Sequence, residues 1–545
     1  MRLNRSSFLS TALAFCCTVA GTLSIAQEPV AIVSISNLDR LKKDVSYMLE
    51  ATNFQSVAPM VDFFGGYYTK GIDGSRPIGV SVTLNGQQPS ALIFVPVTDA
   101  EALFGVLEEA SVQVDELETG LWELITPGPA LFAKKSGDWL FMAQTEEELA
   151  GDLPQAPHEQ LGTLPNKYDL AIRLNVQALP EEMKNMAKEN LRAGFESNMQ
   201  AQTDQTEEER ELAEQVGRAQ LEQIERLMTE TDKVFIGWSI ESAKKVTYID
   251  VGATVVPGTM LAENAALAMK ATTDYSAFIL PSASAKFRFT QQIPESERET
   301  TTQNMDNSLR QAGVMIDKSN DIPDGVKPAI KGVVDSLGAL LKDTINEGKL
   351  DGAGSASVAG GKLRLLIGGR ISDGNALAAE VQKRAKEIEG MANAPKFEFG
   401  YAEHGGVTLH RVTATVADPK AQQVVGGEAV LTVGTADKGF IIALDSEGDA
   451  LVKQAIDKMQ SNLDKSAQPF ESAIKVGDIL SFIQSISPNS MLDNAVQQIE
   501  SYAENDLVQV NGRAIENGGI YRLSIDEGVL KAVGSAAQGG GGGGF

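Results

Sequence analysis

The alternation of apolar and polar residues predicts that this chain is built from short strands joined by helices. Residues 168–176, YDLAIRLNV, alternate with period two, which predicts a half-buried strand with its apolar residues on one face. At 90–109 an unbroken apolar strand leads through a turn at Thr98-Asp99 into an amphipathic helix. Asp99 is expected to begin that helix, since a carboxylate there accepts hydrogen bonds from the first exposed N–H groups.

The same design returns at residues 363–389, with a strand, a turn at Ser372-Asp373 and a helix. Two shorter matches support a repeat: Ala171-Ile172-Arg173 with Ala473-Ile474-Lys475, and Ser239-Ile240-Glu241 with Ala514-Ile515-Glu516. Hairpins interrupted by helices follow one another in both halves. The pattern therefore predicts an α+β fold of two degenerate copies, each an antiparallel or mixed sheet with helices packed on it.

The repeat divides the chain into four predicted segments: a signal peptide at 1–26, a first α+β copy at 27–273, a second copy at 274–534 and a Gly-rich flexible tail at 535–545. The first copy is expected to carry a long helical arm at about 179–231, which breaks near Gln202-Thr203-Asp204. Two interpretations of the arm stay open. Its helices pack on their own sheet, or they form a dimerising coiled coil, for which the heptads are few.

The N-terminal segment has the three parts of a cleavable secretory signal. Arg2 and Arg5 precede an uncharged apolar run at 8–25, and Ser24-Ile25-Ala26 places small residues at −3 and −1 of a cleavage site before Gln27. No apolar run after residue 26 is long enough to cross a bilayer. The sequence thus predicts a secreted or periplasmic protein with no transmembrane segment after cleavage.

Both cysteines, Cys16 and Cys17, lie inside this segment, so the mature chain has none. Lipidation of either is disfavoured, because bulky Phe15 stands where a small residue is required. An exported chain without cysteine has no disulfide, no thiolate nucleophile and no cysteine-ligated metal. Removing the two arginines of the segment lowers the formal net charge from −26 to −28. A surface this acidic repels nucleic acid and anionic headgroups, and it is typical of a soluble protein.

Sequence motifs for the common catalytic and cofactor sites are absent. The nearest approach to a phosphate-binding loop, GSASVAGGK at 354–362, has the wrong spacing and is followed by Leu363 where Ser or Thr is required. No nucleophile elbow, HExxH motif or EF-hand loop occurs. No cofactor and no catalytic residue is therefore assigned, and the sequence leans against an enzyme.

Two of the three histidines give the strongest metal-site hypothesis. His404 and His410 flank a predicted hairpin turn at Gly405-Gly406, and Glu403 lies beside them. Two imidazoles and one carboxylate form a common zinc ligand set. The competing interpretation is that these are ordinary surface residues of a hairpin, and no metal is assigned.

Two stretches carry a family resemblance, SALIFVPVTDAEAL at 90–103 and PALFAKKSGDWLFMAQTEEEL at 129–149. Together with the signal and the acidic, cysteine-free mature chain, they resemble uncharacterised exported proteins of planctomycete-type bacteria. The likeness covers most of the mature chain. It implies an exported α+β protein, and because that family has no assigned activity, it transfers no role to any residue here.

These features favour an exported, soluble, non-catalytic binding or scaffolding protein of the bacterial cell envelope, whose partner is an envelope protein or a small ligand. Two alternatives stay open. One is a carboxylate-type hydrolase with its site between the two copies, for which two facing carboxylates in a deep cleft are expected. The other is a carrier of an apolar ligand held between sheet and helices.

Overall fold

We describe a computed structural model of the chain, which covers residues 28–126, 128–201, 207–319, 322, 324–358, 361–390, 394–445, 448–461, 465, 467–488, 490–501 and 505–539. The predicted signal peptide, with Cys16 and Cys17, and the predicted helix break at 202–204 lie outside these residues. The described residues form two compact units. The first holds those up to Ala187, Thr231–Thr254 and those from Val533, and the second holds Lys188–Glu230 and Val255–Ala532.

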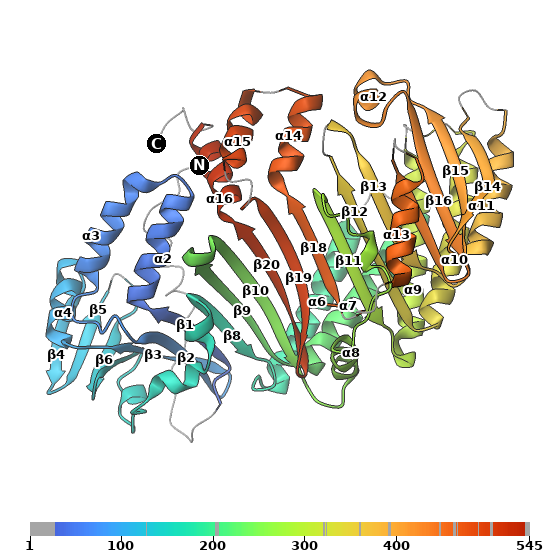
Figure 1. The fold of residues 1–545 in the computed structure, drawn as a ribbon. Helices are drawn as coiled ribbons and strands as arrows, with labels where there is room; N and C mark the ends of the chain where they lie inside the picture. Colours follow the sequence, from blue (N-terminus) through green and yellow to red (C-terminus); the bar gives the residue numbers. More distant parts are fainter. Residues whose placement is uncertain are drawn as a thin grey trace. The chain divides into compact units, whose positions relative to one another are not determined.

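The described part of the first unit contains a sheet of ten strands: β1 (Ala31–Asn37), β2 (Pro77–Asn85), β3 (Gln88–Pro96), β4 (Gln113–Glu118), β5 (Leu121–Ile125), β6 (Leu131–Ser136), β7 (Trp139–Ala143), β8 (Leu170–Asn175), β9 (Thr231–Glu241) and β10 (Val246–Val255). Their order across the sheet is β4-β5-β6-β7-β3-β2-β1-β8-β9-β10 (Figure 1). All neighbours from β4 to β9 pair antiparallel.

The described part of the second unit also contains ten strands: β11 (Ala285–Gln292), β12 (Lys349–Ser357), β13 (Arg364–Arg370), β14 (Lys396–His404), β15 (Val407–Thr415), β16 (Glu428–Ala436), β17 (Gly439–Leu444), β18 (Phe470–Lys475), β19 (Leu507–Ile515) and β20 (Gly518–Asp526). Their order is β14-β15-β16-β17-β13-β12-β11-β18-β19-β20, and all neighbours pair antiparallel. Each strand number exceeds by ten the number at the same place in the first sheet.

Helices interrupt the two series of strands at corresponding places. Two follow the first strand of each series, one follows the third, two follow the eighth and one follows the tenth. In the first series these are α2 (Leu38–Ala51), α3 (Ala58–Tyr68), α4 (Ala100–Glu109), α6 (Glu181–Ala201), α7 (Glu207–Glu230) and α8 (Met260–Ala268). In the second they are α9 (Glu295–Lys318), α10 (Lys327–Asn346), α11 (Gly374–Ile388), α14 (Val476–Ile486), α15 (Ser490–Glu500) and α16 (Glu527–Gly539).

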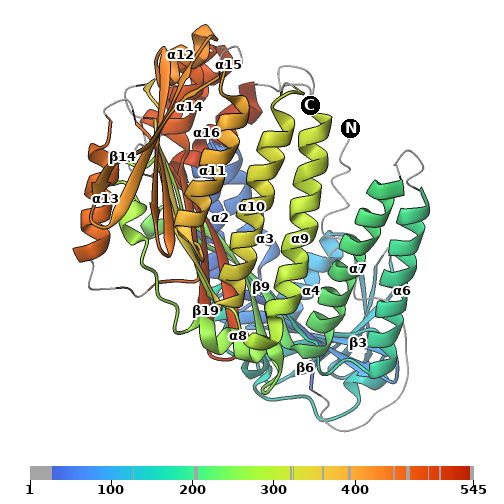
Figure 2. The ribbon, with the colours of Figure 1, turned by 90° about the vertical axis from the view of Figure 1, so that its right-hand side faces the viewer.

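The other described helices are α5 (Leu164–Lys167), α12 (Pro419–Val425), α13 (Ala450–Ser461) and the 3-10 turns η1 (Gln55–Val57), η2 (Glu147–Leu149), η3 (Pro157–Leu161), η4 (Ser242–Lys244) and η5 (Ser276–Phe278). The architecture confirms the predicted α+β class, with antiparallel sheets and helices. The predicted helical arm is the pair α6 and α7. In the second unit α7, α9, α10 and α11 lie side by side (Figure 2), and Arg226 of α7 donates from Nη1 to Glu297 of α9 at 3.0 Å.

Aspartate begins the helix after the third strand in both series, as predicted. Asp99 accepts the Ala102 N–H at 3.1 Å, and Asp373 accepts the Ala376 N–H at 2.9 Å. The backbone angles are nearly the same, with φ and ψ of −150° and 105° at Asp99 and of −153° and 100° at Asp373. Each carboxylate satisfies a backbone donor that has no partner inside the helix.

The first unit buries a cluster on each face of its sheet. Phe94 and Phe141 belong to one cluster, whereas their chain neighbours Val95 and Leu140 belong to the other, beneath α4. In the second unit a large cluster gathers around Phe278 and the helix α13, and a smaller one forms beside α16.

Three local predictions differ from the structure. The pair Gly65-Gly66 predicts a break in a helix, yet α3 continues to Tyr68, and Thr69 Oγ1 donates to the Gly65 carbonyl at 2.6 Å and accepts from Lys42 Nζ at 2.8 Å. Thr145 and Glu148 match a capping box and predict a helix, but the structure has only the single turn η2, since Gly151 and Pro154 follow at once and disfavour its continuation. Helix α16 continues through Gly539, five residues into the predicted tail.

The two aspartate caps give a stability prediction. Asp99→Ala and Asp373→Ala should each lower the free energy of unfolding by about 1 kcal/mol, because each leaves a backbone N–H without its acceptor. Asp99→Asn and Asp373→Asn keep an acceptor oxygen and should restore most of the loss. Denaturant unfolding measures both. A loss of the same size from Asp152→Ala, at an exposed loop position, would show that the effect is not one of capping.

Candidate functional site

Strand β8 turns its aliphatic side chains outward. Leu170, Ile172 and Leu174 expose between 38% and 50% of their surface, whereas Ala171 and Asn175 expose 1% and 5%. The predicted strand and its alternation are therefore confirmed, but the expected burial of the apolar half is wrong.

The other face of this strand is buried, because Ala171 belongs to the hydrophobic cluster of Phe94 and Phe141. Buried polar contacts lie just before the strand: the Asp169 carboxylate pairs with Arg40 Nε at 2.8 Å and accepts the Ile240 N–H at 2.7 Å, and the Tyr168 hydroxyl donates to Asp250 at 2.9 Å. A buried carboxylate must keep such partners, so Asp169 cannot turn outward. Leu170, Ile172 and Leu174 alternate with Asp169 and Ala171 and therefore point the other way.

The outward aliphatic surface continues onto the neighbouring strands. Ile172 pairs with Ile236 on β9. On β10, Ile249 and Val251 alternate with the buried Tyr248 and Asp250, so they share the outward face. We define the aliphatic face as the six side chains Leu170, Ile172, Leu174, Ile236, Ile249 and Val251, each of which is 38–50% exposed.

The aliphatic face is continuous with a covered part of the same sheet. Ile35 on β1 pairs with Leu170 on one side and with Ile78 on the other. Ile78 packs into the buried cluster beneath α4. Helix α4 thus covers this face at one end of the sheet, and the aliphatic face is its exposed continuation.

The second unit exposes apolar side chains on the matching strands. Phe289 of β11, Ile474 of β18, and Tyr521 and Leu523 of β20 are 36–58% exposed. The register of β11, β18, β19 and β20 puts all four on one face. Ile474 is also the residue that the sequence repeat aligns with Ile172.

The structure does not bring the predicted metal ligands together. His404 pairs with Val407 and His410 lies three residues further along β15, so the two imidazoles point to opposite faces of the hairpin. His404 Nε2 lies 2.7 Å from Asp457 Oδ1. Glu403 pairs with Thr408, which is two residues from His410, so Glu403 lies on the same face of the hairpin as His410.

His410 is held within its own hairpin. Its Nδ1 accepts the Gly400 N–H at 3.1 Å, and burial lowers the pKa of its imidazole. No group of three His, Cys, Asp or Glu side chains that could hold a metal ion occurs in the part of the chain that the structure describes.

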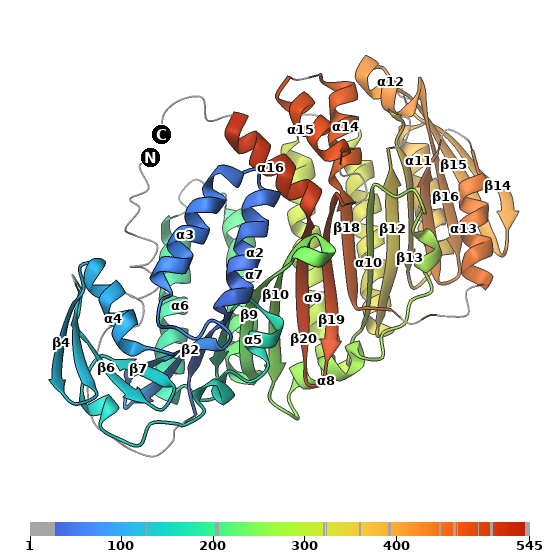
Figure 3. The ribbon, with the colours of Figure 1, turned by 60° about the vertical axis from the view of Figure 1, so that its left-hand side comes forward.

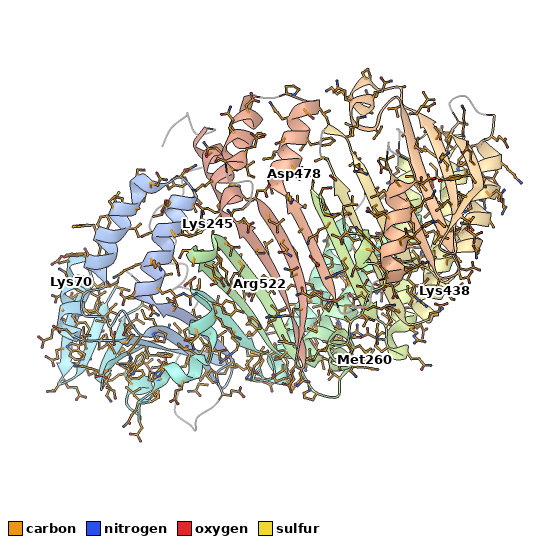
Figure 4. All side chains as sticks on the ribbon, in the orientation of Figure 1. Lys70, Lys245, Met260, Lys438, Asp478 and Arg522 are labelled. Atoms are coloured by element: carbon orange, nitrogen blue, oxygen red, sulfur yellow. The ribbon has the colours of Figure 1, made fainter. Side chains whose placement is uncertain are left out.

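A pocket of about 350 Å³ opens in the second unit beside α14 and α15. Asp478, in the first turn of α14 (Figure 4), lines it together with Lys475, Glu500 and Asp506. Ser284 Oγ donates to Asp478 at 2.7 Å. Sequence patterns gave no sign of this pocket, because its residues come from segments that only the fold brings together.

Two carboxyl groups at this place have raised pKa values. Burial raises the pKa of Asp506, and the charge of Asp478 raises it further, although the Gly477 N–H acts in the opposite direction. Burial also raises the pKa of Asp526, to which the charge of Asp506 adds. The pocket therefore disfavours ionisation of Asp506 relative to a carboxyl in water.

Comparisons with known proteins give no family. No family model and no curated protein matches the chain. A solved structure titled "Structure of crystal form IV of TP0453" has 6% identity and a TM-score of 0.23 over 43% of this chain and 79% of that chain. A likeness this loose carries no argument about fold or function. Among the described helices, none is long and apolar enough to cross a membrane.

The acidic pocket gives a prediction of pH dependence. The folded-state pKa of Asp506 lies above the ordinary value of 3.8, so its stabilising contribution is present below that pH and is lost as the pH rises through the folded-state pKa. Asp506→Asn keeps an acceptor for the Gly477 N–H and does not ionise. It should raise the free energy of unfolding at neutral pH and flatten its decline from acid to neutral pH.

Denaturant unfolding at a series of pH values measures this effect. Glu516→Gln, which removes an exposed carboxylate, is the matched control and should leave the pH profile unchanged. An Asp506→Asn protein that is less stable than the parent at neutral pH would contradict the prediction.

Proposed function

We propose that this protein is an exported, non-catalytic binding protein whose ligand is an apolar chain, such as the acyl chain of a lipid. The aliphatic face carries the proposal. Monomeric proteins rarely expose contiguous apolar patches of more than a few hundred Å², and larger ones mark ligand or partner sites. Here the polar side of β8 is buried and the aliphatic side is exposed, which is the reverse of the usual arrangement for a sheet with one solvated face.

The chemistry of the face favours acyl chains over peptides or sugars. Strands β8 and β9 lie inside the sheet, so neighbouring strands on both sides use their backbone N–H and C=O groups. The face therefore offers a ligand aliphatic side chains and no hydrogen-bond donor. A peptide backbone or a sugar placed here would lose its hydrogen bonds to water without replacement, which is costly. An alkyl chain has no hydrogen bonds to lose, and its transfer from water to the apolar face is favourable.

We further propose that the two units are copies of one design, each with such a face. The repeated strand order, the matching helices and the shared aspartate caps support this view. Export through the N-terminal signal, a place in the bacterial envelope and kinship with planctomycete-type exported proteins belong to the same proposal. They rest on the sequence alone.

Binding of a fluorescent long-chain fatty acid by the processed chain, which begins at Gln27, tests the proposed function. The double variant Ile172→Gln/Ile236→Gln should bind about tenfold more weakly or worse, because each half-exposed isoleucine contributes roughly 1 kcal/mol when the ligand covers it. Leu117→Gln, which changes an equally exposed residue on β4, is the matched control and should bind normally. A parent protein that does not bind, or a double variant that binds as well as the parent, would overturn the proposal.

Hydrolysis by carboxylates is a second candidate function, favoured by the raised pKa of Asp506. A carboxyl with a raised pKa keeps its proton to a higher pH and can act as a general acid, and Asp478 and Glu500 line the same pocket. On this alternative, the purified protein turns over a member of a panel of glycosides and esters. Asp506→Asn should then lower the rate about 100-fold or more. No turnover by the parent protein would exclude it.

A further inference from the structure

Helix α3 of the first unit presents a row of large apolar side chains to solvent. Six large apolar side chains of α3, of η1 and of the residue before η1 expose between 38% and 69% of their surface: Phe54, Val57, Met60, Phe63, Phe64 and Tyr68. We call these six residues the aromatic ridge. No described side chain of α3 is buried. The helix therefore gains little from the core of its own unit, and water meets most of its apolar surface.

The packing of α3 on α2 explains why the large side chains point outward. The two helices lie side by side (Figure 3). Gly65 and Thr69 face α2: a Cβ atom on Gly65 would lie 3.7 Å from Lys42 Cε, and Lys42 Nζ donates to Thr69. Positions four residues apart share one face of a helix, so α3 turns its small residues to α2. Met60, Phe63 and Phe64 lie away from that contact and remain exposed.

Rings of the ridge contact one another, and a lysine lies over the neighbouring Tyr67. The ring centroids of Phe63 and Phe64 are 5.5 Å apart, and those of Phe64 and Tyr68 are 5.9 Å apart. The ammonium of Lys70, labelled beside α3 in Figure 4, lies 4.3 Å from the centre of the Tyr67 ring. Each exposed ring still gains free energy if an apolar partner removes it from water.

We propose that the aromatic ridge docks the protein on the surface of a bilayer that contains anionic lipid, with α3 lying in the interfacial plane. Phenylalanine and methionine suit the acyl boundary, and the tyrosine hydroxyl suits the depth of the headgroups. Lys70 follows the ridge two residues after Tyr68 and Lys42 lies beside α3 on α2, so both can provide ammonium groups to anionic headgroups near the helix.

The net charge of −26 does not oppose this local attraction strongly. At physiological ionic strength, charges more than about 8 Å apart are largely screened, so the lysines at the contact outweigh distant carboxylates. The ridge shares no residue with the aliphatic face, and the proposal stands without the proposed ligand. Docking on a membrane would, however, bring a carrier of acyl chains to their source.

Vesicle flotation of the processed chain tests the proposal, with vesicles of phosphatidylcholine alone and of an equimolar mixture with phosphatidylglycerol. The parent protein should float with the mixed vesicles. Met60→Gln/Phe63→Gln should reduce the bound fraction about tenfold or more, because it removes the two most exposed side chains of the ridge. The matched control is Met315→Gln, which alters a 73% exposed methionine on α9 and should float like the parent.

Two further variants separate charge from apolar contact. Lys70→Gln should weaken binding to the mixed vesicles and leave binding to phosphatidylcholine unchanged. Met60→Gln/Phe63→Gln should also keep its affinity for the soluble fatty acid, so that failure of one proposal is distinct from failure of the other.

Three results would overturn membrane docking. They are a parent protein that stays with the soluble fraction, a ridge variant that floats like the parent, and a dimer that becomes monomeric in the ridge variant while the parent does not float. The last result would identify the ridge as a contact between two copies of the chain.

Discussion

Successive side chains of a β-strand point to opposite faces, and this constraint decides what the first unit shows to its surroundings. Just before β8, Asp169 pairs with Arg40 and accepts the Ile240 N–H, and Tyr168 donates to Asp250. The Asp169 carboxylate is without access to water and must keep its partners, and Ala171 on the same face lies in a hydrophobic cluster. Because that face is fixed inward, Leu170, Ile172 and Leu174 lie on the outer face. The exposed aliphatic surface is thus the consequence of burying the opposite face of the strand.

The two proposed sites expose apolar surface in chemically different ways. The aliphatic face is part of a sheet, its side chains are branched and aliphatic, and its strands β8 and β9 are paired with neighbours on both sides. The aromatic ridge belongs to a helix, mixes phenylalanine with tyrosine and has lysines at its side. The first chemistry suits a single alkyl chain, and the second suits the boundary between acyl chains and headgroups. A protein with both sites could take an apolar molecule from a membrane surface. The acidic pocket of the second unit suits acid–base chemistry instead.

Local predictions from the sequence succeeded where neighbouring residues decide the outcome. The caps at Asp99 and Asp373 formed because the carboxylate meets an N–H only three residues away. The pair Asn85-Gly86 is a strong hairpin signal in the sequence, and the hairpin formed because Gly86 takes a φ of 65°, which glycine adopts without strain. The metal hypothesis depended on His404 and His410 meeting across a hairpin. It failed because three residues along a strand reverse the side on which a residue lies.

The sequence by itself determined the α+β class, the strands, most of the helices and the period-two pattern that makes one side of β8 aliphatic. It could not determine which side of that strand faces the core. Period two is the same for a strand that buries its apolar side and for one that exposes it. Only the tertiary structure decided this, because the partners of Asp169 come from residues as far apart in the chain as Arg40 and Ile240. The acidic pocket and the exposed ridge of α3 have the same origin, since both depend on contacts between segments and on no local pattern.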